Sequence, residues 1–512
     1  MLSRRQFLAR SGATGAALVF APDALAAPKL LRGGKFTSGV ISGDPTPTGI
    51  TLWTRVDGAG GTGGVRLEVA RDRGFRHVVA HRTLTARERA DHAVKARIGG
   101  LKPHERYYYR FETKGEDSPV GRFQTALPKD SRETVRFAFF SCQEYSFGYF
   151  NAHARLAHED VDFVVNLGDY IYSDVSLAPP LGVRDPKFVL SGGFSAVTKD
   201  EYRDRYKRYR EDSSLRKMHA QFPMISLWDD HEVQNDYAGG DPAGGGVTGD
   251  PYSPARRNLA YDVFFEQMPT FPVRRSGHRL YHSARFGRMV DLFVLDERQY
   301  RAAQPCGDAR GPACDELGNP RPFLGAQQLA FARGGIKRSK AAWKVIANEV
   351  VMMPIKVTTE TFDAFDAWHG YPVEREALLR TVKGVDDVVF ITGDYHAFIA
   401  GDVQTADGRT VATEFVGGSV SSSTEPEINS IIKLPGWGTP DAPAMPPDEL
   451  ARRKAANPWY AELDYLHHGY VVCEASKSSF KATFRKLQTV RRRSTALASS
   501  KTYTVKRGHA GL

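Results

Sequence analysis

Five short apolar stretches of the sequence each end in residues that can bind a metal or transfer a proton. One Asp after such a stretch is weak evidence, because Asp is also a common turn and helix-capping residue. Five such ends in one chain are harder to assign to turns alone, so together they predict one shared metal site. The five ends are Ser141-Cys142, Gly168-Asp169-Tyr170-Ile171-Tyr172, Asp229-Asp230-His231-Glu232, Asn348-Glu349 and Gly393-Asp394-Tyr395-His396.

This mixture of carboxylate, imidazole, thiol and phenol groups suits the hydrolysis of a phosphate ester. The anionic oxygens of phosphate repel hydroxide, so an enzyme supplies cations that neutralise them and lower the pKa of a bound water. Asp169 is suited to bridge two ions, and Tyr172 follows three residues later. A phenolate and a thiolate together favour trivalent iron over magnesium. Asp394 and His396 are two residues apart, so both can face the same ions from one loop.

The elements that must position these residues are strands and helices in alternation. The five apolar stretches are short, as is typical of strands that are covered on both faces. Two longer segments have a helical pattern, and the second is expected to end at Gly334-Gly335. Such alternation predicts an α/β sheet whose chemistry lies beyond the carboxyl ends of its strands. The expected strands are 135–140, 163–167, 224–228, 345–347 and 388–392, and the expected helices are 202–218 and 326–333.

The segment before this part has a different composition. Residues 33–127 contain regularly spaced β-type runs separated by Gly and Pro, which predicts a β-sandwich. Leu101-Lys102-Pro103 followed by Arg106–Arg110 resembles the corner of fibronectin-type modules. No catalytic constellation is evident, so we interpret it as structural or substrate-shaping. We place this N-terminal domain at residues 30–128 and the catalytic domain at 133–512. The strands of the N-terminal domain are expected at 36–41, 49–56, 65–70, 78–84, 93–98 and 107–112.

Residues 1–27 have the pattern of an export signal. Arg4-Arg5 precede Phe7 and Leu8, a Gly/Ala-rich apolar stretch follows, and Ala24-Leu25-Ala26 offers a cleavage site. This combination predicts export by the twin-arginine machinery, and hence a periplasmic or secreted protein. The apolar stretch is too short for a mature membrane anchor, so no stable membrane insertion is expected.

Composition excludes several classes of protein. The 512 residues include 41% hydrophobic side chains, which is enough for a sizeable core and excludes a disordered chain. The 70 Lys and Arg exceed the 59 Asp and Glu by 11, but they form no basic stripe, so nucleic-acid binding is not expected except as a substrate. Four cysteines exclude a disulfide-stapled scaffold. Cys306 and Cys314, eight residues apart, are a plausible disulfide that would leave Cys142 free, and Cys473 is expected to be buried and inert.

The order of the motifs resembles a known superfamily. Gly168-Asp169-x-x-Tyr172, Asp229–Glu232 and Gly393-Asp394-x-His396 follow one another as GDxxY, GNHE and GHxH do in calcineurin-like metallophosphoesterases. The stretches NLGDYIY, WDDHE, NEVVMMP and TGDYH, with the twin arginines and the β-sandwich, are similar to the alkaline phosphatase D (PhoD) family. The resemblance covers nearly the whole mature chain. It implies a four-layer α/β/β/α metallophosphoesterase domain and a secreted phosphatase that releases phosphate through attack by a metal-bound hydroxide.

The resemblance also implies roles for particular residues. The expected ligands of Fe³⁺ are Cys142, Asp169, Tyr172 and His396, with Asp169 bridging to a second cation. The expected ligands of that cation, predicted to be Ca²⁺ from its preference for oxygen, are Asp230, Asn348 and Asp394. His231 is expected to contact the substrate or protonate the leaving oxygen, with Asp229 as its support.

Several interpretations stay open at this point. Arg298 is expected either to grip phosphate oxygens or to pair with Asp296 at the surface. Asn235 either orients a ligand or caps a turn, and His467 and His468 are expected to bind no metal. Residues 178–195, 238–253 and 418–447 are predicted to be long loops, and the C-terminal residues 501–508 a strand instead of a lid helix.

Two alternatives to a phosphomonoesterase also remain. An uncovered cleft would admit diesters, so a phosphodiesterase or phospholipase D-like hydrolase of the same family is the first. A non-catalytic envelope binding protein is the second, although a complete ligand set argues against it.

Overall fold

The computed structural model describes residues 28–174, 179, 182–188, 195–239, 252–273, 277–439 and 442–512. The predicted export signal lies outside the described residues, as do most of the predicted loop 238–253 and parts of the loop 178–195. Among the helices of the described ranges, none has the length and apolar character that spanning a bilayer requires.

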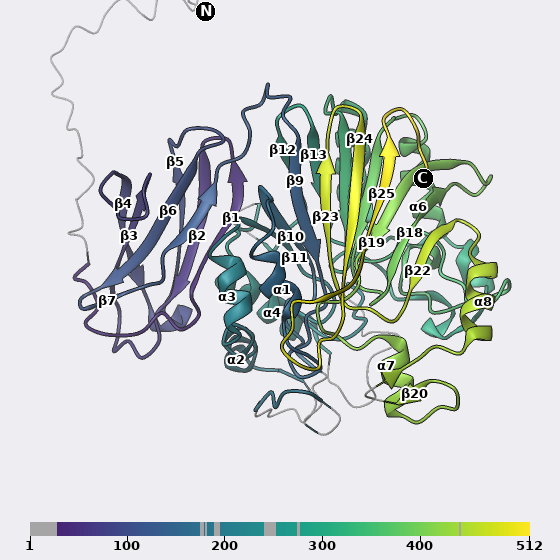
Figure 1. The fold of residues 1–512 in the computed structure, drawn as a ribbon, viewed down its shortest axis with the longest axis horizontal. Coiled ribbons are helices and arrows are strands. Elements are labelled where there is room, and N and C mark those ends of the chain that lie inside the picture. The colour runs from purple at the N-terminus through teal and green to yellow at the C-terminus, as the bar shows by residue number, and fades with distance from the viewer. Residues whose placement is uncertain are drawn as a thin grey trace, which may run out of the picture.

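The N-terminal part is the predicted β-sandwich (Figure 1). One of its sheets has the strand order β4-β3-β6-β7, with β8 paired to β6, and it faces the strands β1, β2 and β5. The predicted corner is present, because the Tyr107 hydroxyl accepts a 3.0 Å hydrogen bond from the Lys102 amide. The strands are β1 Val40–Thr46, β2 Gly49–Arg55, β3 Gly63–Ala70, β4 Val78–Ala86, β5 Ala93–Gly99, β6 Arg106–Thr113, β7 Glu116–Asp117 and β8 Gly121–Gln124.

The sandwich is not separate from the rest of the molecule. Strand β1 pairs in parallel with β11, and Gly43 lies opposite Met224. The strands β1, β2 and β5 therefore extend a nine-stranded sheet of order β25-β24-β23-β9-β10-β11-β1-β2-β5. Its remaining strands are β9 Val135–Phe140, β10 Phe163–Leu167, β11 Met224–Leu227, β23 Gly469–Ala475, β24 Ser479–Leu487 and β25 Leu497–Lys506.

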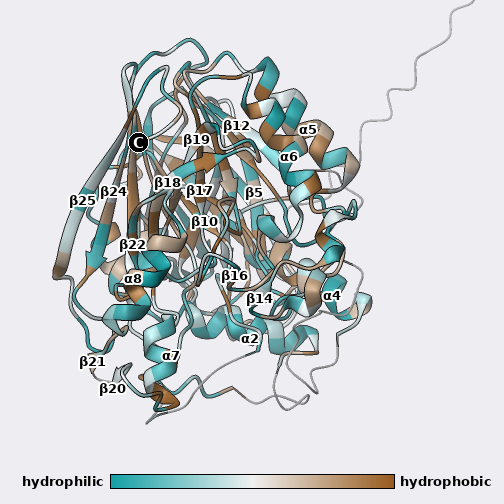
Figure 2. Cartoon of the chain, turned by 90° about the vertical axis from the view of Figure 1, so that its right-hand side faces the viewer, coloured by the Kyte–Doolittle hydropathy of each residue, from teal (hydrophilic) through white to brown (hydrophobic). Residues whose placement is uncertain are grey.

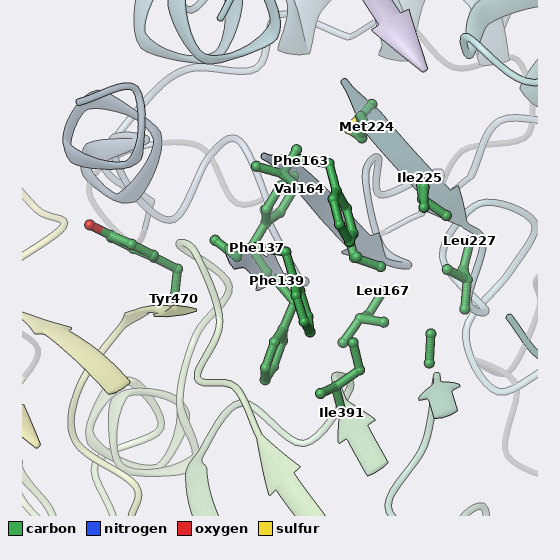
Figure 3. Close-up of a cluster of buried hydrophobic side chains, with 14 of the residues drawn as sticks. Phe137, Phe139, Phe163, Val164, Leu167, Met224, Ile225, Leu227, Ile391 and Tyr470 are labelled. Atoms are coloured by element: carbon green, nitrogen blue, oxygen red, sulfur yellow. The ribbon is translucent and has the colours of Figure 1, made fainter. Parts of the chain in front are cut away.

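A seven-stranded sheet of order β12-β13-β15-β17-β19-β18-β22 packs against the first. The apolar core between them includes Phe137, Phe163 and Leu167 from the first sheet and Ile391 from the second (Figure 3). The ring of Phe163 stacks 4.0 Å from that of Phe286 on β12, across the two sheets. The strands are β12 His282–Phe286, β13 Val290–Val294, β15 Trp343–Asn348, β17 Val388–Thr392, β18 Phe398–Gln404, β19 Thr410–Val416 and β22 Tyr460–Asp464.

Helices complete the four layers. On the first sheet, α1 contacts β23 and α3 contacts β1, while α6 contacts β19 of the second. Figure 2 shows α5 beside α6, with α7, α8 and the small hairpin β20–β21 at another corner. The helices are α1 Asn151–Leu156, α2 Lys199–Tyr209, α3 Ser213–His219, α4 Pro254–Gln267, α5 Gly325–Arg338, α6 Pro372–Val382, α7 Glu425–Ile431 and α8 Pro447–Ala456; the short strand pairs are β14 Gly311–Pro312 with β16 Thr361–Phe362, and β20 Gly438–Thr439 with β21 Ala442–Pro443.

The predicted helix 202–218 is wrong as a single element. It is two helices, because the Asp212 carboxylate accepts a 2.8 Å hydrogen bond from the Ser214 amide and starts a new helix there. The second predicted helix does not end at the two glycines. It continues to Arg338, and a side chain at Gly335 would meet Phe293 at 2.5 Å, so this glycine serves packing against the sheet.

Two other predictions concern the C-terminal part of the chain. The predicted loop 418–447 is wrong in part, because it contains α7, whose first turn is fixed by a capping box between Thr424 and Glu427. The predicted C-terminal strand is confirmed as β25, Leu497–Lys506.

Candidate metal centre

The predicted ligands lie at one edge of the two sheets, where parallel strands end. Cys142 follows β9, Asp169 follows β10, and Asp394 and His396 follow β17. All four have positive φ angles, of 57°, 55°, 64° and 51° respectively. Such backbone strain in residues with a Cβ is concentrated at functional sites, where the surrounding structure imposes it.

Two glycines let these loops approach each other. A Cβ on Gly168, whose φ is +101°, would lie 2.4 Å from the Asp229 Cβ. A Cβ on Gly393 would lie 2.8 Å from the Ser141 Cβ. At both positions glycine therefore permits an approach that a side chain would prevent.

The first group of donors brings together Cys142, Asp169, His396 and Tyr172. Ligand atoms of the first three lie within 4.8 Å of one another. The Tyr172 hydroxyl donates a 2.9 Å hydrogen bond to Asp169 Oδ2 and lies 3.2 Å from His396 Nε2. His396 Nδ1 contacts the Ser423 carbonyl oxygen at 2.8 Å, so Nδ1 carries the proton and Nε2 is left for a ligand.

Burial sets the protonation of this group. Burial, assisted by the Asp169 charge, raises the pKa of both Cys142 and Tyr172 well above their ordinary values. Burial lowers the pKa of His396 to about 4, which keeps its imidazole neutral. A cation would compensate the charge of the thiolate and phenolate, and this S, O, O, N donor set fits a trivalent iron.

The second group is built from carboxylates. Asp229, Asp230 and Asp394 place oxygens within 4.8 Å of one another, and so do Asp169, Asp230 and His231 with their own ligand atoms. Asp229 Oδ2 and Asp230 Oδ1 are buried and make no hydrogen bond among the described residues. Buried oxygens without a donor are expensive, and a hard cation such as Ca²⁺ would satisfy them. Asp169 belongs to both groups, as a bridging ligand must.

The predicted ligand Asn348 ends β15 and already makes hydrogen bonds within the protein. Its Oδ1 accepts a 2.9 Å hydrogen bond from Trp368 Nε1, and its Nδ2 donates to the Val350 carbonyl and, at 3.3 Å, to Thr392 Oγ1. The Asn348 carbonyl oxygen has a second lone pair for a cation, and its role as a ligand stays a prediction.

His231 lies at the first group and is held by an acid that the sequence analysis missed. Its ring stacks on Tyr172 at 3.9 Å, and its Nδ1 lies 2.6 Å from Asp174 Oδ1. Burial opposes the imidazolium, but Asp174, Asp230 and Asp169 outweigh it and raise the pKa of His231 well above its ordinary value. The prediction that Asp229 supports His231 is wrong, because Asp229 contacts Arg298 instead. The backbone N–H of Asn235 donates to Asp174 at 2.8 Å, so Asn235 lies beside the pair of Asp174 and His231.

Arg298 is not a surface residue, and the alternative of a surface pair with Asp296 is wrong. Its side chain is 0% exposed and is surrounded by acids. Its Nε donates to Asp229 and its Nη1 to Asp366 at 2.7 Å. Its Nη2 lies 3.5 Å from Asp394 and makes no hydrogen bond among the described residues. The guanidinium therefore balances charge between the two carboxylate loops.

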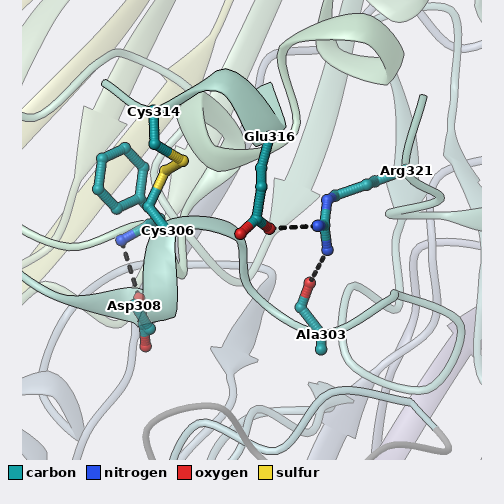
Figure 4. Close-up of a disulfide and its surroundings, with 7 residues drawn as sticks. Ala303, Cys306, Asp308, Cys314, Glu316 and Arg321 are labelled. Carbon is teal, nitrogen blue, oxygen red and sulfur yellow. Dashed lines mark hydrogen bonds and ion pairs between the residues drawn. A yellow bond between two sulfur atoms is a disulfide. The ribbon is translucent and has the colours of Figure 1, made fainter. Parts of the chain in front are cut away.

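A third group of acids borders the centre. Asp236, Asp308 and Asp366 place oxygens within 4.8 Å of one another and are partly exposed. Asp308 lies in the loop that a disulfide between Cys306 and Cys314 closes, so the predicted pairing is confirmed (Figure 4). The Phe365 amide donates to Asp308 at 2.8 Å, which ties this loop to the segment that carries Asp366.

The remaining sequence predictions concern Cys142, Cys473 and the two histidines that precede β23. Both cysteines are free and buried, as expected. His467 pairs with Asp464 at 2.8 Å and His468 with Glu427 at 3.1 Å, so neither joins a candidate metal group.

Comparisons with known proteins agree with this fold and identify its family. The sequence profile described as PhoD-like phosphatase matches residues 137–484, and that of the PhoD-like phosphatase N-terminal domain matches residues 24–127. Alkaline phosphatase D of Bacillus subtilis (strain 168) is 33% identical over 502 residues, which cover 93% of this chain and 82% of the relative.

Solved structures extend the comparison. A structure of PhoD has a TM-score of 0.81 and 31% identity, covering 93% of this chain and 92% of that one. A purple acid phosphatase from yellow lupin (Lupinus luteus) seeds, at 13% identity, shares the fold with a TM-score of 0.51 over 93% of this chain and 73% of its own. A family profile over more than half of the chain and a relative covered over most of its length lead to one conclusion: this chain belongs to the PhoD-like phosphatase family and is an alkaline phosphatase D-like phosphoesterase.

Proposed function

We propose that this protein is an exported phosphoesterase that releases phosphate from organic phosphate esters and depends on Fe³⁺ and Ca²⁺. The observation that carries the proposal is the buried convergence of Cys142, Asp169, Tyr172 and His396 beside a second group of carboxylates. Export by the twin-arginine route, and hence a periplasmic or secreted location, rests on the Arg4-Arg5 segment of the sequence.

The donor types assign the ions. Cys142, Asp169, Tyr172 and His396 would hold Fe³⁺, and Asp230, Asp394 and Asn348 would hold Ca²⁺. When bound, the cations would neutralise phosphate oxygens and lower the pKa of a water molecule.

The residues of the chain supply the remaining functions. Arg298 Nη2 faces Asp230 and Asp394 without a hydrogen bond among the described residues, so it is the donor available to a phosphate oxygen. The imidazolium of His231, fixed through Nδ1 by Asp174, would present Nε2 and donate its proton to the departing alkoxide. Burial of Asp169, Asp230 and Arg298 lowers the local dielectric and strengthens these interactions.

Diester hydrolysis by the same site is the second candidate function. It is favoured by the C-terminal segment, because β25 extends the first sheet and leaves no C-terminal helix over the centre in the described residues. A site that no such helix covers would admit a phosphate that carries two organic groups. The two candidates differ in substrate and share the same metal groups.

The test combines metal content with turnover. Asp169→Asn should abolish both iron loading and hydrolysis. Asp386→Asn should change neither, because Asp386 is exposed and precedes β17, whereas Asp394 follows the other end of that strand. Tyr172→Phe should remove a visible tyrosinate-to-iron absorption band while the protein still folds. A fully iron-loaded and active Asp169→Asn protein would exclude this assignment.

The substrate is tested by comparing p-nitrophenyl phosphate with bis-p-nitrophenyl phosphate at alkaline pH with calcium. Faster turnover of the monoester supports phosphate release as the function. Faster turnover of the diester would instead support diester hydrolysis, the second candidate function.

A further inference from the structure

A cavity beside the metal centre is not used by the proposed chemistry. Its volume is ≈ 320 Å³, which is within the range of small-molecule sites. Its walls come from separate parts of the chain, including the disulfide-closed loop, the segment before α6, the loop after β17 and α7 with the residues that follow it. The residues on which the argument depends are Arg310, Asp363, Tyr395, Glu425, Trp437 and Tyr465. Figure 1 shows α7 and β20 at the same end of the molecule as the ends of β9, β10 and β11.

Two of the wall residues are close in sequence to predicted ligands or to residues that contact them. Tyr395 stands between Asp394 and His396 in the sequence. Glu425 follows two residues after Ser423, whose carbonyl oxygen contacts His396 Nδ1. Because two residues of extended chain span at most about 7 Å, these walls begin directly beside the metal groups.

Two more walls continue from the third group of acids. Arg310 follows Asp308 by two residues, and Asp363 precedes Asp366 by three. Asp366 in turn accepts the hydrogen bond from Arg298. The organic part of an ester whose phosphate reaches Arg298 therefore has this cavity within reach.

The lining combines flat aromatic faces with hydrogen-bonding groups. The Tyr395 hydroxyl donates to Asp363 at 2.6 Å and lies 3.2 Å from the Tyr465 hydroxyl. Arg310, about half exposed, bridges Asp363 and Glu425 at the mouth. Trp437 is partly buried and lines the side formed by the residues after α7.

The floor of the cavity is rigid. The Arg453 side chain of α8 is 0% exposed and pairs with Glu425 at 2.7 Å and with Glu449 at 2.7 Å. Its guanidinium also lies 5.0 Å from the centre of the Tyr465 ring. A buried arginine thus fixes both the carboxylate of Glu425 and the aromatic ring beside it.

We propose that this cavity is a specificity site for a flat, nitrogen-containing ring, such as a nucleobase, in the organic part of the ester. A ring stacked on Trp437 can donate a ring or amino N–H to Asp363 or Glu425, and its carbonyl oxygens or ring nitrogens can accept from Arg310. A lipid chain would gain nothing from these paired charges at the mouth. The proposal rests on the proposed phosphoester hydrolysis and adds a substrate preference to it.

The test compares two diesters with the same leaving group, thymidine 5′-(p-nitrophenyl phosphate) and methyl p-nitrophenyl phosphate, on the full metal-loaded enzyme. The wild type should have the higher kcat/KM for the thymidine ester. Trp437→Ala should lower that value by about 5- to 100-fold, the range of base stacking on an aromatic side chain, and leave the methyl ester within about 2-fold. Trp437→Phe should retain most of the preference.

Ile432→Ala is the matched control, because Ile432 belongs to the same segment, is 61% exposed and does not line the cavity. It should leave both rates unchanged. Equal loss of both esters in Trp437→Ala, or equal loss in Ile432→Ala, would overturn the proposal. A wild type that hydrolyses both esters at the same rate would overturn the specificity site and leave the proposed function standing. A wild type that hydrolyses p-nitrophenyl phosphate but neither diester would overturn the specificity site alone. A wild type that hydrolyses none of the three esters would overturn both.

Discussion

Arg298 allows a quantitative test of how the centre is held together. Arg298→Met keeps the length of the side chain but removes its charge and its donors. Asp229 loses its side-chain hydrogen-bond donor, and Asp394 loses a charge 3.5 Å away. Asp366 loses the donor on Oδ2 but keeps those of Arg301 and Gln304 on Oδ1. Removing one partner of a buried ion pair costs about 3–5 kcal/mol, because the other charge stays buried and unpaired. We therefore expect the metal-free variant to be less stable by at least about 3 kcal/mol.

Calcium should recover part of this loss. A cation bound among Asp229, Asp230 and Asp394 takes over the role of a positive charge, and a ligand at 100 times its Kd stabilises the folded state by about 2.7 kcal/mol. The stability gained from calcium should therefore be larger in Arg298→Met than in the wild type. The stability of Arg298→Lys should lie between those of the wild type and Arg298→Met. Its single ammonium keeps the charge but cannot bond to both Asp229 and Asp366 as the planar guanidinium does.

The assay is urea unfolding with and without chelator, with the slope checked so that a shift in midpoint reports stability. Arg285→Met is the matched control. Arg285 is 42% exposed on the side chain and lies 3.8 Å from Asp291, so its loss should cost at most about 1 kcal/mol. A metal-free Arg298→Met protein within about 0.5 kcal/mol of the wild type would refute the reasoning.

Three other predictions follow from the geometry. Gly168→Ala should abolish turnover, because the new Cβ would meet Asp229 at 2.4 Å; activity near the wild-type rate would contradict this close approach. Replacing Cys306 and Cys314 by Ser should lower stability by roughly 2.5 kcal/mol in the chain-entropy account and reduce activity, which unfolding and rate measurements would check together. Burial opposes ionisation of Glu462, but its lysine and tyrosine partners lower its pKa from 4.5 to about 2, so it contributes stability above pH 4.5 that is lost as the pH falls towards 2. Glu462→Gln should flatten the acid side of the stability profile, and an unchanged profile would exclude the contribution.

The fold and the centre of the site could be predicted from sequence to different depths. The strand ends that carry Cys142, Asp169 and Asp394 were predictable, because buried parallel strands bring their carboxyl ends to one edge. The supports were harder to predict. Asp366 lies in an irregular segment with no periodicity, and its contact with Arg298 joins positions 68 residues apart. Asp174 could have been considered from the sequence, because it follows Asp169 by only five residues.

Errors in the helices have a local explanation. Asp212 interrupts an otherwise continuous helical pattern by capping the next helix, and the capping box of Thr424 and Glu427 was present in the sequence but overlooked within a polar segment. Gly335 is read as a helix end by composition, yet the packing of Phe293 requires a residue without a side chain in mid-helix.

The pairing of β1 with β11 determines how the chain can be divided. The N-terminal strands cover the edge of the catalytic sheet through the pairing of β1 with β11. The Lys95 ammonium also donates to backbone carbonyls at the end of α4, among them that of Met268 at 3.1 Å. A catalytic domain expressed without the first 128 residues would expose the N–H and C=O groups of β11 as a free sheet margin. Such a fragment should self-associate through that strand, so the N-terminal sandwich protects the enzyme from aggregation whatever it contributes to substrate choice.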